Sequence, residues 1–78
     1  MWPTKGTKMH EILETIQKLS AKCNEGRVPV TEIYHELNDS GRESIRVMLS
    51  QLKRNGLIEA PMRGMYIITP QGLVVLSS

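Results

Sequence analysis

The stretch "SIRVMLSQLKRNGLI", residues 44–58, changes its hydrophobic pattern in mid-course. Its first part places apolar residues three and four positions apart, as on one side of an amphipathic helix: Ile45, Met48, Leu49 and Leu52. Gly56 then ends the helical pattern, and the apolar residues after it are typical of a strand. The stretch therefore predicts a helix that begins at about Gly41 or Arg42 and leads through Gly56 directly into a strand.

Two shorter elements and a turn are predicted before this helix. "RVPV" (27–30) indicates a small edge strand, where the missing donor of proline does little harm. Thr31 is expected to cap the helix "EIYHEL", whose buried side would be Ile33, Tyr34 and Leu37. "NDSG" (38–41) has the composition of a turn, and Ser40 and Glu43 stand at capping-box spacing.

The N-terminal part of the chain predicts a flexible arm followed by another helix. Pro3 and Gly6 discourage regular structure in residues 1–6. Thr7 can then cap a helix with an apolar stripe formed by Met9, Ile12, Leu13, Ile16, Leu19 and Cys23. The helix is expected to stop at "NEG" (24–26), where glycine can adopt the left-handed conformation.

The C-terminal third has the pattern of a hairpin with an apolar tail. Leu57–Ala60 and Met65–Ile68 are strand-like, and "PMRG" between them holds the proline and glycine of a tight turn. Thr69 can cap a short fourth helix that begins at Pro70, although an extended tail is an equal alternative. The residues Leu73–Leu76 are apolar throughout, which predicts burial in the core or against a second subunit.

Size and composition restrict the classes of protein that this chain can form. A sequence of 78 residues predicts a single domain (7–78) after the arm, with a small core. Its one cysteine excludes an internal disulfide, and no long apolar run suggests a signal peptide or a membrane span, so an intracellular, cytoplasmic protein is expected. Cys23, His10 and His35 lack metal-ligand spacing. With no phosphate loop or catalytic constellation, we expect neither an enzyme nor a cofactor.

From Thr31 to Gly72 the sequence resembles the winged helix-turn-helix domains of transcriptional regulators. The motifs that carry the resemblance are "VTEIYHEL", "SIRVMLSQLKRNGLI" and "YIITPQG". Tyr34 departs from the family pattern, which usually has a small residue there. The resemblance implies an α+β, mainly helical fold: three helices, a short strand, a β-hairpin wing and possibly a short C-terminal helix.

The resemblance further implies a sequence-specific regulator that binds duplex DNA, more often a repressor than an activator. The helix at about 42–55 would enter the major groove, with base contacts expected from Arg42, Glu43, Ser44, Arg46, Val47 and Ser50. Arg46 is the strongest candidate for base readout, because a guanidinium can pair bidentately with guanine. Glu43 is either a base reader or only a capping partner.

Contacts to the DNA backbone are expected from residues around this helix and from the wing tip (62–64), namely Thr31, Gln51, Lys53, Arg54, Arg63, Lys5 and Lys8. A homodimer is expected, joined by the C-terminal apolar segment and the outer side of helix one, without a small-molecule effector. The net charge is only +2, so a winged-helix protein–protein module in a larger complex is the main alternative. RNA binding is a third, although few aromatic side chains are present for base stacking.

Overall fold

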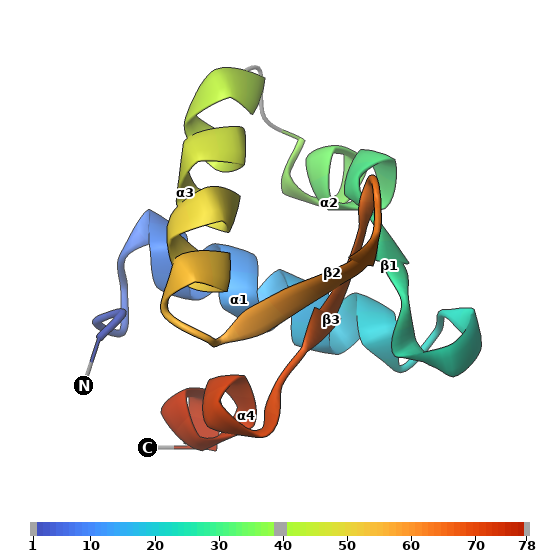
Figure 1. Cartoon of the computed structure of the whole chain (residues 1–78). Coiled ribbons are helices and arrows are strands. Elements are labelled where there is room, and N and C mark those ends of the chain that lie inside the picture. The colour runs from blue at the N-terminus through green and yellow to red at the C-terminus, as the bar shows by residue number, and fades with distance from the viewer. Residues whose placement is uncertain (1, 39–40, 78) are drawn as a thin grey trace.

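The computed structural model describes residues 2–38 and 41–77, and these form an α+β fold (Figure 1). Four α-helices are present in this part of the chain: α1 (Lys8–Ser20), α2 (Val30–Leu37), α3 (Arg42–Arg54) and α4 (Pro70–Ser77). A short 3-10 turn, η1 (Asn24–Gly26), precedes three strands, β1 (Val28–Pro29), β2 (Ile58–Met62) and β3 (Met65–Ile68). The predicted order of elements is therefore confirmed, and the C-terminal segment is a helix.

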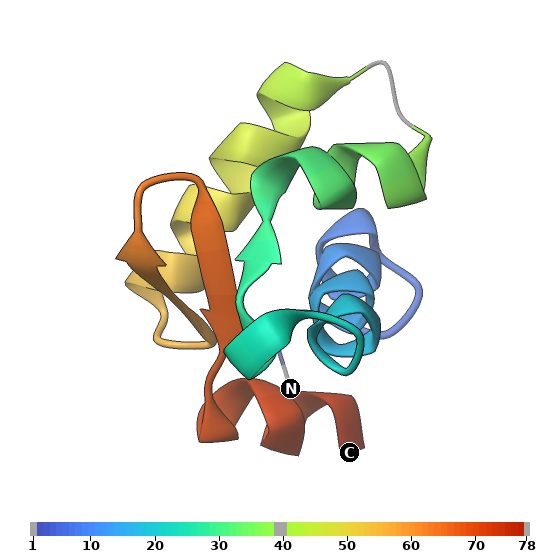
Figure 2. The ribbon, with the colours of Figure 1, turned by 90° about the vertical axis from the view of Figure 1, so that its right-hand side faces the viewer.

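The three strands form an antiparallel sheet in the order β1-β3-β2. Val28 pairs with Tyr66, and Ile58 pairs with Ile68 at the other end of β3. Helix α1 packs against α2, α3, α4 and β3; it lies behind the strands in Figure 1 and beside them in Figure 2. A single helix thus holds the other elements together.

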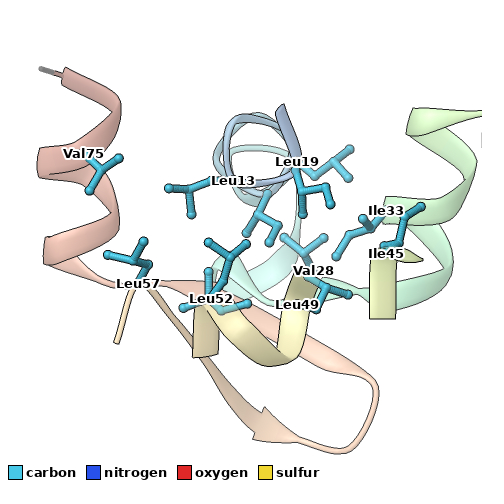
Figure 3. Packing of buried hydrophobic residues seen from close by; sticks show 12 residues of the cluster. Leu13, Leu19, Val28, Ile33, Ile45, Leu49, Leu52, Leu57 and Val75 are labelled. Atoms are coloured by element: carbon cyan, nitrogen blue, oxygen red, sulfur yellow. The ribbon is translucent and has the colours of Figure 1, made fainter. Parts of the chain in front are cut away.

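The hydrophobic core is formed mainly by the apolar sides of α1 and α3 (Figure 3). The buried residues of these helices are Ile12, Leu13, Ile16 and Leu19 from α1, and Ile45, Leu49 and Leu52 from α3. Val28, Ile33, Leu57, Ile58 and Val75 complete the core from the remaining elements. Both predicted stripes are confirmed, except that α1 ends at Ser20, so Cys23 lies beyond the helix and is only partly buried.

The predicted N-terminus of α2 was wrong. The helix begins at Val30 with Pro29 at its N-cap, and Thr31 is an exposed residue inside the helix. No side chain caps this end, since proline has no side-chain acceptor. The Val30 amide, the first of the helix, instead donates a hydrogen bond to the carbonyl oxygen of Gly64 at 2.8 Å.

The predicted turn of the hairpin was also wrong. Strand β2 continues to Met62, which pairs with Met65, so that only Arg63 and Gly64 form the turn. The pairing is irregular between Glu59 and Met62, where β2 has one residue more than β3. A bulge of this kind accepts Pro61, which has no amide to donate to a ladder.

The remaining helix ends follow the prediction in part. Helix α3 begins at Arg42 after Gly41, and Thr7 caps α1 by accepting a hydrogen bond from the His10 amide. The predicted capping box cannot be compared, because Ser40 lies outside the described residues. In α4, Val75 is buried and Leu76 partly buried, whereas Leu73 and Val74 are exposed. The tail thus contributes to the core from one side only.

Thr69 connects three elements through a buried hydroxyl. Its Oγ1 donates to the carbonyl oxygen of Gly56 at 2.6 Å and accepts a hydrogen bond from the Gly72 amide at 3.2 Å. The first bond joins the end of α3 to the end of β3, and the second caps α4, as predicted.

Thr69→Val preserves the shape of this side chain but removes both hydrogen bonds. We expect the free energy of unfolding to fall by about 2 kcal/mol in urea denaturation, since the buried Gly72 amide and the Gly56 carbonyl both lose their partner. Thr7→Val is the control, because it removes a capping hydroxyl at an exposed site and should cost only about 1 kcal/mol. Equal losses for the two variants would contradict the connecting role of Thr69.

Candidate functional site

Helix α3 exposes a polar and basic side opposite its apolar stripe. All of the predicted base-contact residues on it are exposed: Arg42, Glu43, Ser44, Arg46, Val47 and Ser50. Gln51, Lys53 and Arg54 are exposed as well. At about 100° per residue, these residues divide between two flanks and an outer ridge. The two flanks contact different parts of the molecule.

The first flank carries Arg42, Arg46 and Lys53 and is turned toward α2 and the sheet. The guanidinium carbon of Arg42 lies 5.1 Å from the centre of the Tyr34 ring on α2. This is the geometry of a cation–π interaction. Lys53 borders a hollow of about 700 Å³ together with Glu59, Ile67 and Gln71. The basic flank is therefore next to the hairpin rather than on the far side of the helix.

Tyr66 on β3 is the second aromatic residue beside this flank. Burial raises the pKa of its phenol above the ordinary value of 10.0, and Tyr34 acts in the same direction. Arg46 opposes both effects, because its charge favours the phenolate. Arg42 thus contacts Tyr34, and the charge of Arg46 acts on Tyr66. We call Tyr34, Arg42, Arg46 and Tyr66 the arginine–tyrosine cluster.

The second flank of α3 forms a shallow hollow of about 340 Å³, lined by Glu43, Ser44, Val47, Met48 and Gln51. Val47 is 54% exposed, which is high for an apolar side chain. Between the two flanks, the outer ridge carries Glu43 and Arg54, with Ser50 and Val47 at its borders. This ridge is the part of the helix that would reach deepest into a groove.

The remaining predicted contacts lie on two opposite sides of the molecule. Arg63 is exposed at the hairpin tip, and the bond between Val30 and Gly64 brings that tip beside Thr31. Lys5 is exposed in the N-terminal segment and Lys8 is partly exposed at the start of α1. In both views this segment and the hairpin are on opposite sides (Figures 1 and 2). The structure therefore brings Thr31 and Arg63 together, but not Lys5 and Lys8 with them.

Charge is distributed unequally among the helices. Helix α3 has four basic residues and one acidic residue, Glu43. Helix α1 has two lysines and two glutamates, and α2 has two glutamates without lysine or arginine. The ammonium group of Lys18 is 2.8 Å from the Glu36 carboxylate. This bond and the Lys18 charge lower the pKa of Glu36. The positive charge that remains available to a partner is thus concentrated on α3.

The described residues contain no group of three or more His, Cys, Asp or Glu side chains that could hold a metal ion. Within the same ranges, no helix has the length and apolar character needed to cross a membrane. Comparison with known proteins gives no match: no family model, no curated protein and no solved structure is significantly similar to this chain.

The two tyrosines were not among the predicted site residues. Tyr34 was interpreted as a buried helix residue and Tyr66 as a strand residue, and both are only partly buried. The departure of Tyr34 from the family pattern was a signal that something lies against that position. Nothing in the local pattern placed Tyr66 beside Arg46, because the two residues are brought together only by the fold.

The Tyr66 pKa can be measured in the variant Tyr34→Phe, which leaves Tyr66 as the one tyrosine of the chain. We expect its phenol to titrate above pH 10.0, as followed by tyrosinate absorbance, because burial disfavours the charged form. Adding Arg46→Ala should raise the pKa further. A fall in pKa on this second substitution would contradict the placement of Arg46 beside Tyr66.

The sign of the linkage to stability follows from the raised pKa. The folded state favours the neutral phenol, so this contribution to stability is present below pH 10.0. It is lost as the pH rises through the raised pKa of the folded protein.

Proposed function

We propose that this chain is a winged helix-turn-helix domain that binds duplex DNA as a sequence-specific transcriptional regulator, and more specifically as a repressor. The observation that carries the proposal is the basic, exposed side of α3, which follows α2 and precedes a two-stranded hairpin. A helix of 13 residues fits the major groove of B-DNA, whose phosphates attract lysine and arginine.

In this proposal the outer ridge of α3 contacts the base edges. Ser50 can bond to a base or a phosphate, and exposed Val47 can contact a thymine methyl group. Arg54, near the end of the helix, and Arg63 on the hairpin contact the backbone.

The apolar hollow around Val47 and Met48 favours one alternative function. An exposed apolar side chain at this position could equally be a contact with another protein in a larger complex. That function does not require phosphate contacts, so binding measurements at different salt concentrations separate the two possibilities.

Binding of a random-sequence duplex over a salt series tests the proposal. We expect wild-type affinity to fall steeply with salt, and Arg54→Ala/Arg63→Ala to flatten the slope by about 0.9 for each phosphate contact that is lost. The control Lys18→Ala/Lys22→Ala removes the same charge from the region of α1 and should keep the wild-type slope. No binding at low salt would refute the proposal and favour the protein–protein module.

We further propose that the chain forms a homodimer through α4. This helix has no charged residue, and its Leu73 and Val74 are 43% and 56% exposed. Trp2, also exposed, lies with Val74 and Pro70 at an almost entirely apolar hollow of about 420 Å³. The exposed residues of α1 are polar, so the N-terminal segment is a better second contact than helix one. A charge-free surface is complementary to a second copy of itself.

Two copies also match the requirements of DNA recognition. One small domain contacts too few base pairs for strong specific binding, and paired domains on a palindromic site overcome this. Helix α4 lies at the opposite end of the molecule from the start of α3 (Figure 1), so dimer contacts leave the exposed side of α3 accessible.

Leu73→Asp/Val74→Asp should make the protein monomeric in sedimentation equilibrium, because two carboxylates at an isologous contact repel each other and resist burial. Ser50→Asp is the control: it adds negative charge to α3 and should leave the dimer intact while weakening DNA binding. A wild-type protein that is monomeric at all concentrations would refute the dimer.

A further inference from the structure

One flank of α3 carries two exposed arginines, and two partly buried tyrosines lie near it: Arg42 contacts the Tyr34 ring on α2, and the charge of Arg46 acts on Tyr66 of β3. Arg42 and Arg46 are one helical turn apart, and like charges at this spacing repel each other. Among the described residues neither arginine forms an ion pair with a carboxylate. Within residues 2–38 and 41–77, no carboxylate therefore relieves this repulsion, whereas an anion between the two guanidinium groups would relieve it.

The tyrosines give this junction the remaining features of an anion site. Arg42 lies 5.1 Å from the Tyr34 ring, which holds the guanidinium in place. Tyr66 is fixed by its position on the central strand, opposite Val28. Phenol hydroxyls are donors that commonly bind phosphate oxygens in DNA complexes. Two positively charged guanidinium groups and two neutral hydroxyl donors are together suited to bind the negatively charged oxygens of a phosphodiester.

The position on the helix distinguishes phosphate from base contact. A helix with its side chains has a diameter of about 10–12 Å, and the major groove is about 12 Å wide. The outer ridge of such a helix meets the bases, while its flanks meet the walls of the groove, where the phosphates are. Arg42 and Arg46 are on a flank, not on the ridge.

We propose that the arginine–tyrosine cluster is a binding site for one backbone phosphate of duplex DNA, so that Arg46 positions the helix instead of reading a base. This inference rests on the proposed function and revises the roles expected for Arg42 and Arg46. Base readout then belongs to the side chains of the ridge. Sequence preference would depend on Val47 and Ser50.

Arg46→Ala tests the proposal against base readout. We expect its affinity to fall roughly ten-fold on every duplex sequence, and the salt slope to decrease by about 0.9, because one charged phosphate contact is lost. The relative affinities across a library of duplexes should not change. The control Lys22→Ala removes one positive charge in the turn after α1 and should keep the wild-type slope.

Tyr66→Phe keeps the ring and all charges but removes one hydroxyl. Affinity should fall roughly three-fold with an unchanged salt slope, because a neutral hydrogen bond is lost without a counterion being released. In nuclear magnetic resonance spectra, adding duplex should shift the ring signals of Tyr34 and Tyr66, and Arg46→Ala should reduce these shifts. Thermal unfolding of each variant shows whether it remains folded.

The possible results separate the two proposals. A wild-type protein that does not bind duplex DNA overturns both the proposed function and the phosphate site. A wild-type protein that binds, with Arg46→Ala altering the preference for particular base pairs at an unchanged salt slope, overturns the phosphate site alone. Equal affinities and salt slopes for Arg46→Ala and Lys22→Ala would also overturn the phosphate site alone.

Discussion

The junction at the end of α3 is the constraint on which the arrangement of the other elements depends. Gly56 adopts a φ of +76° and turns the chain out of the helix, and the amide of Leu57 still bonds to the Leu52 carbonyl at 3.0 Å. The Leu57 carbonyl oxygen then accepts a hydrogen bond from the Thr69 amide at 3.1 Å. The bond from the Thr69 hydroxyl to the Gly56 carbonyl lies next to it. Helix α3, the hairpin and α4 are thereby joined within a few residues.

The close packing at this junction also limits which residue α4 can have at position 72. The Cβ of any larger residue at Gly72 would collide with the backbone oxygen of Leu57 and lie 2.7 Å from the Ile68 side chain. Glycine thus permits α4 to approach the base of the hairpin closely, and Val75 reaches the core. In this way a short helix adds an apolar side chain to the core of a small domain.

The hydrophobic periods predicted the helices and their buried sides because α1 and α3 each face one core. The ends of elements were predicted less well, since they are decided by distant partners. The amide of Val30 bonds to Gly64, 34 residues away in the numbering, so local capping patterns pointed to Thr31 instead. Likewise, the side chains of α3 were recognised as exposed, but their division between two flanks depends on where α2 and β3 pack. The role suggested for Arg46 changes for that reason.

The hydrogen bond between Val30 and Gly64 has a mechanical consequence. It joins the tip of the hairpin to the first turn of α2, which couples the position of the hairpin to that helix. A surface of this kind loses little conformational entropy on association, because its backbone is already ordered. In the proposed complex with DNA, such a surface would adjust little, so the duplex would supply the deformation. Duplexes that bend or widen easily would then be favoured without any contact to their bases.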